Sequence, residues 1–174
     1  SIAKKYNLII LSDEIYSELS FEKKFKSISS FCPKKTIISS GLSKWCGAGG
    51  WRLGYFIVPN SLNILKDSIN VLASETFSAV SAPIQYAAIS AYSNDHSEYI
   101  NNSRNILKAV GFYVYKSLKS NKVLINKPQG GFYLMPEFIN KKFSSSSEMC
   151  NNILKETGVA LLPGSDFGFE KAKM

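Results

Sequence analysis

Short apolar runs separated by polar and glycine-rich segments dominate the first third of the chain. Residues 7–11 are apolar without alternation, which is typical of a strand buried on both faces of a parallel sheet. Similar strands are predicted over residues 36–40 and 53–58, the latter ended by Pro59. About twelve residues join these two strands, which is tight for a helical crossover. We therefore expect the third strand to run antiparallel to its neighbours.

The apolar period then changes to that of helices. Helices are predicted over residues 61–72, 81–91 and 95–118. Asp95 precedes the longest of them as a capping residue, with Glu98 closing a capping box. His96, the one histidine of the chain, is expected to lie exposed on the first turn. A single histidine also argues against a Ser-His-Asp triad or a two-histidine metal site.

The last third of the chain mixes short strands with one helix. Ser145 and Glu148 form a capping box that opens a helix ending near Gly158. Three short strands are predicted, over residues 123–125, 132–134 and 159–162, and a turn over residues 127–131 separates the first two. This change of texture places a domain boundary within the long helix, near residues 95 to 120.

The composition is that of an ordinary globular protein, with 174 residues, 45% hydrophobic and 20% charged. The net charge of +8 comes from scattered lysines, and only Arg52 and Arg104 are arginines, so we expect no nucleic-acid partner. No apolar stretch reaches the ~18 to 20 residues of a spanning helix, so we expect no membrane association. Three widely spaced cysteines predict no zinc or other metal site and favour reduced thiols and a cytoplasmic location.

Polar side chains follow two of the predicted parallel strands. Asp13 and Tyr16 follow the first, Ser43 and Lys44 follow the second, and Arg52 comes eight residues after Lys44. In open α/β sheets, ligands bind outside the carboxyl ends of the strands. A carboxylate, a phenol, an amine and a guanidinium together suit a phosphorylated aromatic aldehyde with a pyridine nitrogen. Each residue alone would also fit an ordinary surface or packing role.

The spacing of these residues resembles that of a known family. Residues 41–55, Gly-Leu-Ser-Lys-Trp-Cys-Gly-Ala-Gly-Gly-Trp-Arg-Leu-Gly-Tyr, closely resemble the cofactor-lysine signature of class I/II aminotransferases, which depend on pyridoxal 5′-phosphate (PLP). Residues 12–16 resemble the Asp-x-x-Tyr segment of that family. Residues 128–133 resemble its small-domain hairpin, and residues 163–168 resemble a late loop beside the substrate. These landmarks cover nearly the whole chain in the family's order.

The resemblance implies a role for each site residue. Lys44 would be the catalytic residue, forming a Schiff base with PLP and moving a proton between the substrate and the cofactor. Asp13 would pair with the pyridine nitrogen, and Tyr16 would hydrogen-bond the ring oxygen. Arg52 would bind the phosphate, with Ser43 as a weaker candidate for the same group.

The resemblance also implies the architecture. The expected fold is α/β, the PLP-dependent transferase fold type I, with a partial, mostly parallel sheet with helices and a partial α/β small domain. Residues 1–95 would form the C-terminal part of the PLP-binding large domain, and residues 96–174 the linking helix and an incomplete small domain. Gly41 stands where many relatives carry a phosphate-binding serine, so that hydroxyl contact would be lost.

The expected activity is amino-group transfer between an amino acid and a 2-oxo acid, in a parent protein that is a homodimer. We expect the chain to be a fragment, because relatives are more than twice as long and the arginine that holds the substrate carboxylate would follow Gly168. Two alternatives remain open. Other fold-type-I enzymes, such as β-eliminating lyases or synthases, use the same cofactor residues, and some transcription regulators carry an aminotransferase-like domain.

Overall fold

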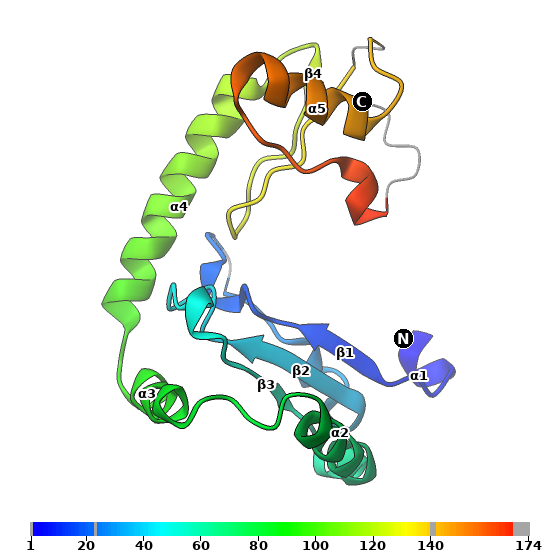
Figure 1. Ribbon diagram of the computed structural model, residues 1–174, viewed down its shortest axis with the longest axis vertical. Coiled ribbons are helices and arrows are strands. Elements are labelled where there is room, and N and C mark those ends of the chain that lie inside the picture. The colour runs from blue at the N-terminus through cyan, green and yellow to red at the C-terminus, as the bar shows by residue number, and fades with distance from the viewer. Residues whose placement is uncertain (1, 23, 140–141, 169–174) are drawn as a thin grey trace. The chain divides into compact units, whose positions relative to one another are not determined.

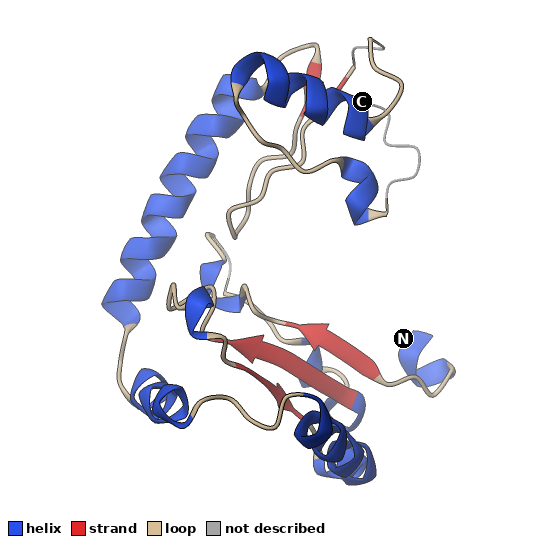
Figure 2. Cartoon of the chain, viewed as in Figure 1, coloured by secondary structure: helices blue, strands red, loops and turns tan. Residues whose placement is uncertain are grey.

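The computed structural model describes residues 2–22, 24–139 and 142–168. The chain forms two compact units that divide between Ile106 and Leu107, inside helix α4 (Ser97–Leu118). Each unit has its own sheet, and Figure 2 shows helices and strands in both. The assignment of residues 1–95 and 96–174 to a large and a small domain concerns the complete protein and stays a prediction.

The first unit contains a three-stranded sheet in the order β1 (Ile10–Asp13), β2 (Thr36–Gly41), β3 (Gly54–Ile57) (Figure 1). β1 pairs parallel to β2, and β3 pairs antiparallel to β2, as the sequence predicts. In register, Asp13 pairs with Ser39 and Gly41 pairs with Gly54.

One expectation about the first strand is wrong. β1 begins three residues later than the predicted run and includes Ser12 and Asp13. Its residues alternate between half-buried and exposed, and 65% of Leu11 is exposed. The strand is therefore buried on one face of this chain rather than on both. An apolar run shows that a strand is suited to burial on both faces. Whether both faces are buried depends on which elements cover the sheet.

Helices α1 (Ile2–Lys5), α2 (Asn63–Thr76) and α3 (Ala82–Ser93) complete the first unit together with the first turns of α4. α2 extends four residues beyond its predicted end, whereas Pro83 lies in the first turn of α3 as expected. Asp95 caps α4, since its Oδ1 accepts a hydrogen bond of 2.9 Å from the backbone nitrogen of Ser97. Short 3-10 helices cover Ser17–Leu19, Ile28–Ser30, Pro33–Lys35, Gly49–Trp51 and Asn60–Leu62.

The core that positions the site lies between the β2–β3 connection and α3. It contains Leu42, Trp45 and Leu53 from the connection and Ala88 from α3, all buried. The small side chain of Ala88 allows the helix to approach the connection closely. The loop that follows β2 is thus packed on a helix rather than extended into solvent.

The second unit contains the two-stranded antiparallel sheet of β4 (Val123–Leu124) and β5 (Glu137–Phe138), helix α5 (Ser146–Thr157) and a 3-10 helix over Gly164–Phe167. The Ser145 hydroxyl accepts a hydrogen bond of 3.1 Å from the backbone nitrogen of Glu148, and Gly158 ends α5 with a φ of 73°. The cap and the terminal glycine of this helix are therefore confirmed.

The predicted strands over residues 132–134 and 159–162 are wrong. β4 pairs with Glu137–Phe138, three residues beyond the predicted end of the second strand, and residues 159–162 are irregular. An apolar triplet forms a strand only where a neighbour's backbone groups pair with it, and so short a run does not specify that pairing.

Gly41 lies where the last pair of the β2–β3 ladder closes on Gly54. A Cβ at Gly41 would lie 2.5 Å from the backbone oxygen of Leu53 and 3.0 Å from the Cα of Gly54. We expect Gly41→Ala and Gly41→Ser each to lower the free energy of unfolding by about 1–3 kcal/mol, because the strands must separate locally. Urea denaturation followed by the fluorescence of the buried Trp45 measures the change.

Gly50 provides a matched control for this prediction. It lies in the same connection, and a Cβ there meets no atom within 4 Å. Gly50→Ala should therefore leave the free energy of unfolding within about 0.5 kcal/mol of the wild-type value. Equal destabilisation by the two alanine variants would show that the close approach at Gly41 is not the cause.

Candidate functional site

The ends of three strands bring the predicted site residues to one edge of the sheet. Asp13 ends β1, and Lys44 follows the end of β2 by three residues. Since β1 and β2 are parallel, both residues come to the same edge. β3 is antiparallel, so Arg52, two residues before its start, comes to that edge as well.

Lys44 and Tyr16 are in contact across the ends of β1 and β2. The Nζ of Lys44 lies over the Tyr16 ring, 5.5 Å from its centroid, and both residues are half-buried. An ammonium in this position is attracted by the ring quadrupole. This contact brings together two side chains that are 28 residues apart in the sequence.

Two adjacent carboxylates at the end of β1 have different surroundings. Asp13 is exposed, and its Oδ1 accepts a hydrogen bond of 3.3 Å from the backbone nitrogen of Ile15. Glu14 is buried, and its Oε1 accepts hydrogen bonds from Ser12 Oγ at 3.0 Å and from Ser27 Oγ at 2.7 Å. Glu14 therefore anchors the turn internally, while Asp13 is left on the outside for a ligand.

No sequence pattern distinguishes Glu14 from the polar residues around it. Its partner Ser27 lies 13 residues away in an irregular stretch, so no periodic pattern connects the two. A buried carboxylate with two hydroxyl donors becomes visible only once the chain is folded.

The glycine-rich segment after Lys44 folds around Arg52. Arg52 adopts a left-handed φ of 56°, and its Nη1 donates a hydrogen bond of 2.7 Å to the backbone oxygen of Gly49. This bond uses one of the five N–H donors of the guanidinium, and the side chain is exposed. A Cβ on Gly49 would lie 3.9 Å from the Cβ of Ser43. Arg52 and Ser43, the two phosphate-binding candidates, therefore both lie near Gly49.

An aromatic cluster holds the residue that follows Lys44. Trp45 is 8% exposed, and its ring lies 5.7 Å from the ring of Tyr92 on α3. Tyr92 in turn meets the ring of Tyr55 on β3 edge-on at 5.6 Å. Tyr92 therefore contacts the rings of both Trp45 and Tyr55. The loop that carries Lys44 is therefore fixed to both a helix and a strand.

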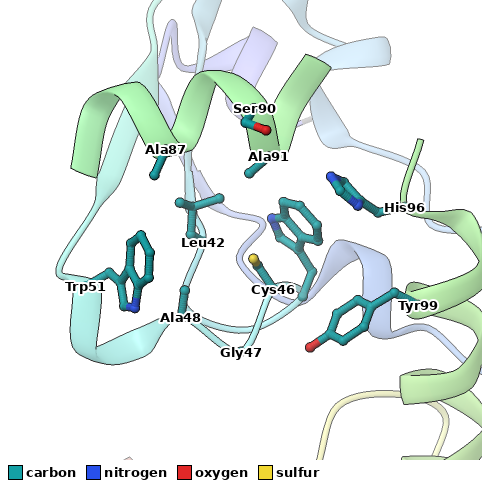
Figure 3. A pocket seen from close by; sticks show the side chains of 11 residues that line it. Leu42, Cys46, Gly47, Ala48, Trp51, Ala87, Ser90, Ala91, His96 and Tyr99 are labelled. Carbon is teal, nitrogen blue, oxygen red and sulfur yellow. The ribbon is translucent and has the colours of Figure 1, made fainter. Parts of the chain in front are cut away.

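His96 is not exposed as expected. It is half-buried, its ring lies 6.0 Å from that of Trp45, and its Nε2 is buried with no hydrogen-bond partner among the described residues. The first turn of α4 packs against the aromatic cluster, which explains the difference. His96 also lines an apolar pocket of about 450 Å³, in which Leu42, Trp51 and Ala87 are seen around the same opening (Figure 3).

The sequence matches the family model described as "Aminotransferase class I and II" over residues 1–173. The chain belongs to this family. It is 34% identical to a probable N-acetyl-LL-diaminopimelate aminotransferase of Bacillus subtilis, over 96% of this chain and 41% of that protein. It is 33% identical to an aspartate aminotransferase of Sulfolobus acidocaldarius, over 99% of this chain and 43% of that protein.

Solved structures of the family share the fold. An alanine aminotransferase from Pyrococcus furiosus matches with a TM-score of 0.83 and 32% identity, over 96% of this chain and 43% of that one. An aromatic aminotransferase from Pyrococcus horikoshii matches with a TM-score of 0.86 and 29% identity, over 96% of this chain and 45% of that one. The predicted α/β fold of the PLP-dependent aminotransferases is thereby confirmed. The chain spans less than half the length of these relatives.

Two further observations concern the described residues only. Among their helices, none is long and apolar enough to cross a membrane. Their histidine, cysteine and acidic side chains form no group of three or more that could hold a metal ion.

The aromatic cluster predicts a response to alkaline pH. Partial burial of Tyr92, of which 48% stays exposed, and next the neighbouring Tyr55 hydroxyl raise the pKa of Tyr92 to about 12. The unfolded chain loses this proton near pH 10, so stability is fully present below pH 10 and falls as the pH rises towards 12. Between pH 9 and 12, the melting temperature of Tyr92→Phe should fall less steeply than that of the wild type. The difference in slope corresponds to at most about one proton released on unfolding.

Tyr86→Phe is the matched control, since Tyr86 lies on the same helix and is 75% exposed. This variant should follow the wild-type pH profile. If Tyr92→Phe melts with the same pH dependence as the wild type, Tyr92 does not hold its proton in the folded protein.

Proposed function

We propose that this chain is the part of a PLP-dependent aminotransferase that carries the cofactor lysine. The enzyme would move an amino group between an amino acid and a 2-oxo acid. The observation that carries the proposal is the contact of Lys44 with the Tyr16 ring. It lies at the edge of the sheet to which the strands also bring Asp13 and Arg52. The similar curated proteins named above are aminotransferases, which supports transfer over elimination.

The side chains at this edge suit the chemical groups of PLP. Lys44 offers a primary amine for the aldehyde, and Asp13 offers an exposed carboxylate for the pyridine nitrogen. Arg52 offers a guanidinium for the phosphate and is bonded to the backbone oxygen of Gly49, and Ser43 lies on the side of Gly49 where a Cβ would point. Bound at these groups, PLP supplies an electron sink for the substrate's α-carbon.

The residues of the chain have separate tasks in this scheme. Lys44 would hold the cofactor through its amine and, once the substrate's amine has displaced it, the freed amine would take and return the proton at the substrate's α-carbon. Asp13 keeps a proton on the pyridine nitrogen by its negative charge. Tyr16 lies against Lys44, and its hydroxyl would donate a hydrogen bond to the ring oxygen. Arg52 and Ser43 would bind the phosphate by charge-assisted and hydroxyl hydrogen bonds.

We infer that the complete active site also needs residues from the part of the family's length that this chain does not span. We include in the proposal a homodimer as the working form of the complete protein, as in the family. The described cysteines Cys32, Cys46 and Cys150 are free, which supports our prediction of a cytoplasmic location.

Covalent labelling tests the role of Lys44. The complete protein is loaded with PLP and reduced with borohydride, and the labelled lysine is located by peptide mass spectrometry. We expect the pyridoxyl group on Lys44. Lys44→Ala should lose the label and lower the rate of keto-acid-dependent amino transfer by at least about 10²–10⁴-fold.

Lys66→Ala, an exposed lysine on α2, is the control and should be labelled and active like the wild type. A label on any lysine other than Lys44 refutes the proposed role. Turnover that needs no keto acid would instead assign the protein to the eliminating enzymes that use the same cofactor residues.

The chain of 174 residues by itself should bind PLP weakly and associate with itself. Large apolar side chains are exposed on the strands and helices of the first unit, including Leu11 (65%), Ile64 (87%) and Tyr86 (75%). β1 and β3 also leave unpaired sheet edges within this chain. Equilibrium dialysis and analytical ultracentrifugation measure the two properties. Tight, stoichiometric PLP binding by a monomer of this chain would contradict the expectation.

A further inference from the structure

Arg104 binds the segment that follows Tyr16. Its Nε and Nη2 donate hydrogen bonds of 3.1 and 2.8 Å to the backbone oxygen of Glu18. The Nη2 also lies 3.8 Å from Glu18 Oε2. The three contacts join residues 86 positions apart in the sequence, and the principal acceptor is a backbone carbonyl rather than a side chain.

The arginine is held in place by its own helix. Arg104 lies in the second turn of α4, and its Nη1 donates a hydrogen bond of 3.1 Å to Asn101 Oδ1, three residues earlier. The backbone at this position is within a continuous helix, so the side chain extends from a fixed base. The planar guanidinium is therefore oriented before it meets the Glu18 carbonyl.

The bound carbonyl is two residues from Tyr16. Residues Ser17–Leu19 form one 3-10 turn, in which the backbone nitrogen of Leu19 donates a hydrogen bond of 2.9 Å to the oxygen of Tyr16. Leu19 is 1% exposed and fixes the far end of the turn in the core. A restraint on the Glu18 carbonyl therefore acts on the orientation of Tyr16.

Packing alone does not hold this turn on its polar side. A cavity of about 430 Å³ lies there, lined by polar side chains including Glu14, Ser17, Ser27 and Arg104. Glu14 anchors the start of the segment from inside through its two serine partners. Arg104 lines the same cavity and holds the other end of the segment through the Glu18 oxygen.

We propose that Arg104 is a positioning residue that holds the turn at Glu18, and through it Tyr16, in place beside Lys44. The inference rests on the proposed function as far as it concerns PLP. The hold on the turn itself is a property of the cofactor-free protein.

The test compares four variants of the complete protein: Arg104→Ala, Arg104→Lys, Glu18→Ala, and Asn105→Ala as an exposed control on the same helix. The first readout is amide hydrogen exchange without PLP. In Arg104→Ala, the amides of residues 16–19 should exchange about tenfold faster, while those of β2 remain unchanged. In Arg104→Lys, the same amides should exchange about threefold faster, because one ammonium cannot reproduce both guanidinium bonds to the Glu18 oxygen.

Glu18→Ala separates the backbone contact from the ion pair. This variant keeps the carbonyl acceptor, so its exchange should stay within twofold of the wild type, as should that of Asn105→Ala. If Glu18→Ala accelerates exchange as much as Arg104→Ala, the ion pair makes the contact and the proposal fails. Unchanged exchange at residues 16–19 in Arg104→Ala also overturns it.

The second readout is the visible circular dichroism of PLP bound to the complete protein, with its dissociation constant. Arg104→Ala should at least halve the dichroic band and weaken PLP binding about tenfold. Faster exchange with an unaltered band would show that Arg104 only stabilises the fold, which overturns the positioning role. If the wild type binds no PLP at Lys44, the proposed function fails, while the exchange data still decide whether Arg104 holds the turn.

Discussion

The central strand β2 makes both of the pairings on which the site depends. Its parallel pairing with β1 places the residues after both strands at one edge, and its antiparallel pairing with β3 returns Arg52 to that edge. A one-residue change of register in either pairing would turn the neighbouring side chains to the opposite face. The close approach of Gly41 to Leu53 and Gly54 adds a constraint on the second pairing, because a Cβ at Gly41 would lie 2.5 Å from the backbone oxygen of Leu53 and would force the strands to shift.

The loop between β2 and β3 turns this backbone geometry into a fixed arrangement of side chains. Trp45 packs against Tyr92 on α3, and the edge-on ring contact of Tyr92 with Tyr55 connects the same cluster to β3. Lys44 thus follows a strand and precedes a buried indole, which leaves its backbone little freedom. On the other side, Glu14 and Arg104 restrain the segment that carries Tyr16. The lysine and the tyrosine meet because each is held independently by its own surroundings.

The sequence predicts local features and the spacing of the family motifs better than it predicts contacts between residues that are distant in the sequence. The strands up to residue 58, the antiparallel direction of the third, the Ser145 cap and the Gly158 terminus all follow from short-range patterns. The strand at Glu137–Phe138 and the packing of His96 do not, because each depends on residues distant in the sequence. The same reason hides Glu14 and Arg104, whose partners lie 13 and 86 positions away.

The outer face of β1 is exposed in this chain, although its sequence predicts burial on both faces. Its apolar run has the composition of a strand covered on both faces, yet Leu8, Ile9 and Leu11 are all about half exposed or more. Relatives align with the chain over nearly all of its length but over less than half of theirs. The contact of Lys44 with the Tyr16 ring needs only the strand pairings within the chain, whereas the outer face of β1 stays exposed among the described residues. The arrangement of the site residues therefore depends on pairings within the chain, and it is independent of whether the outer face of β1 is covered.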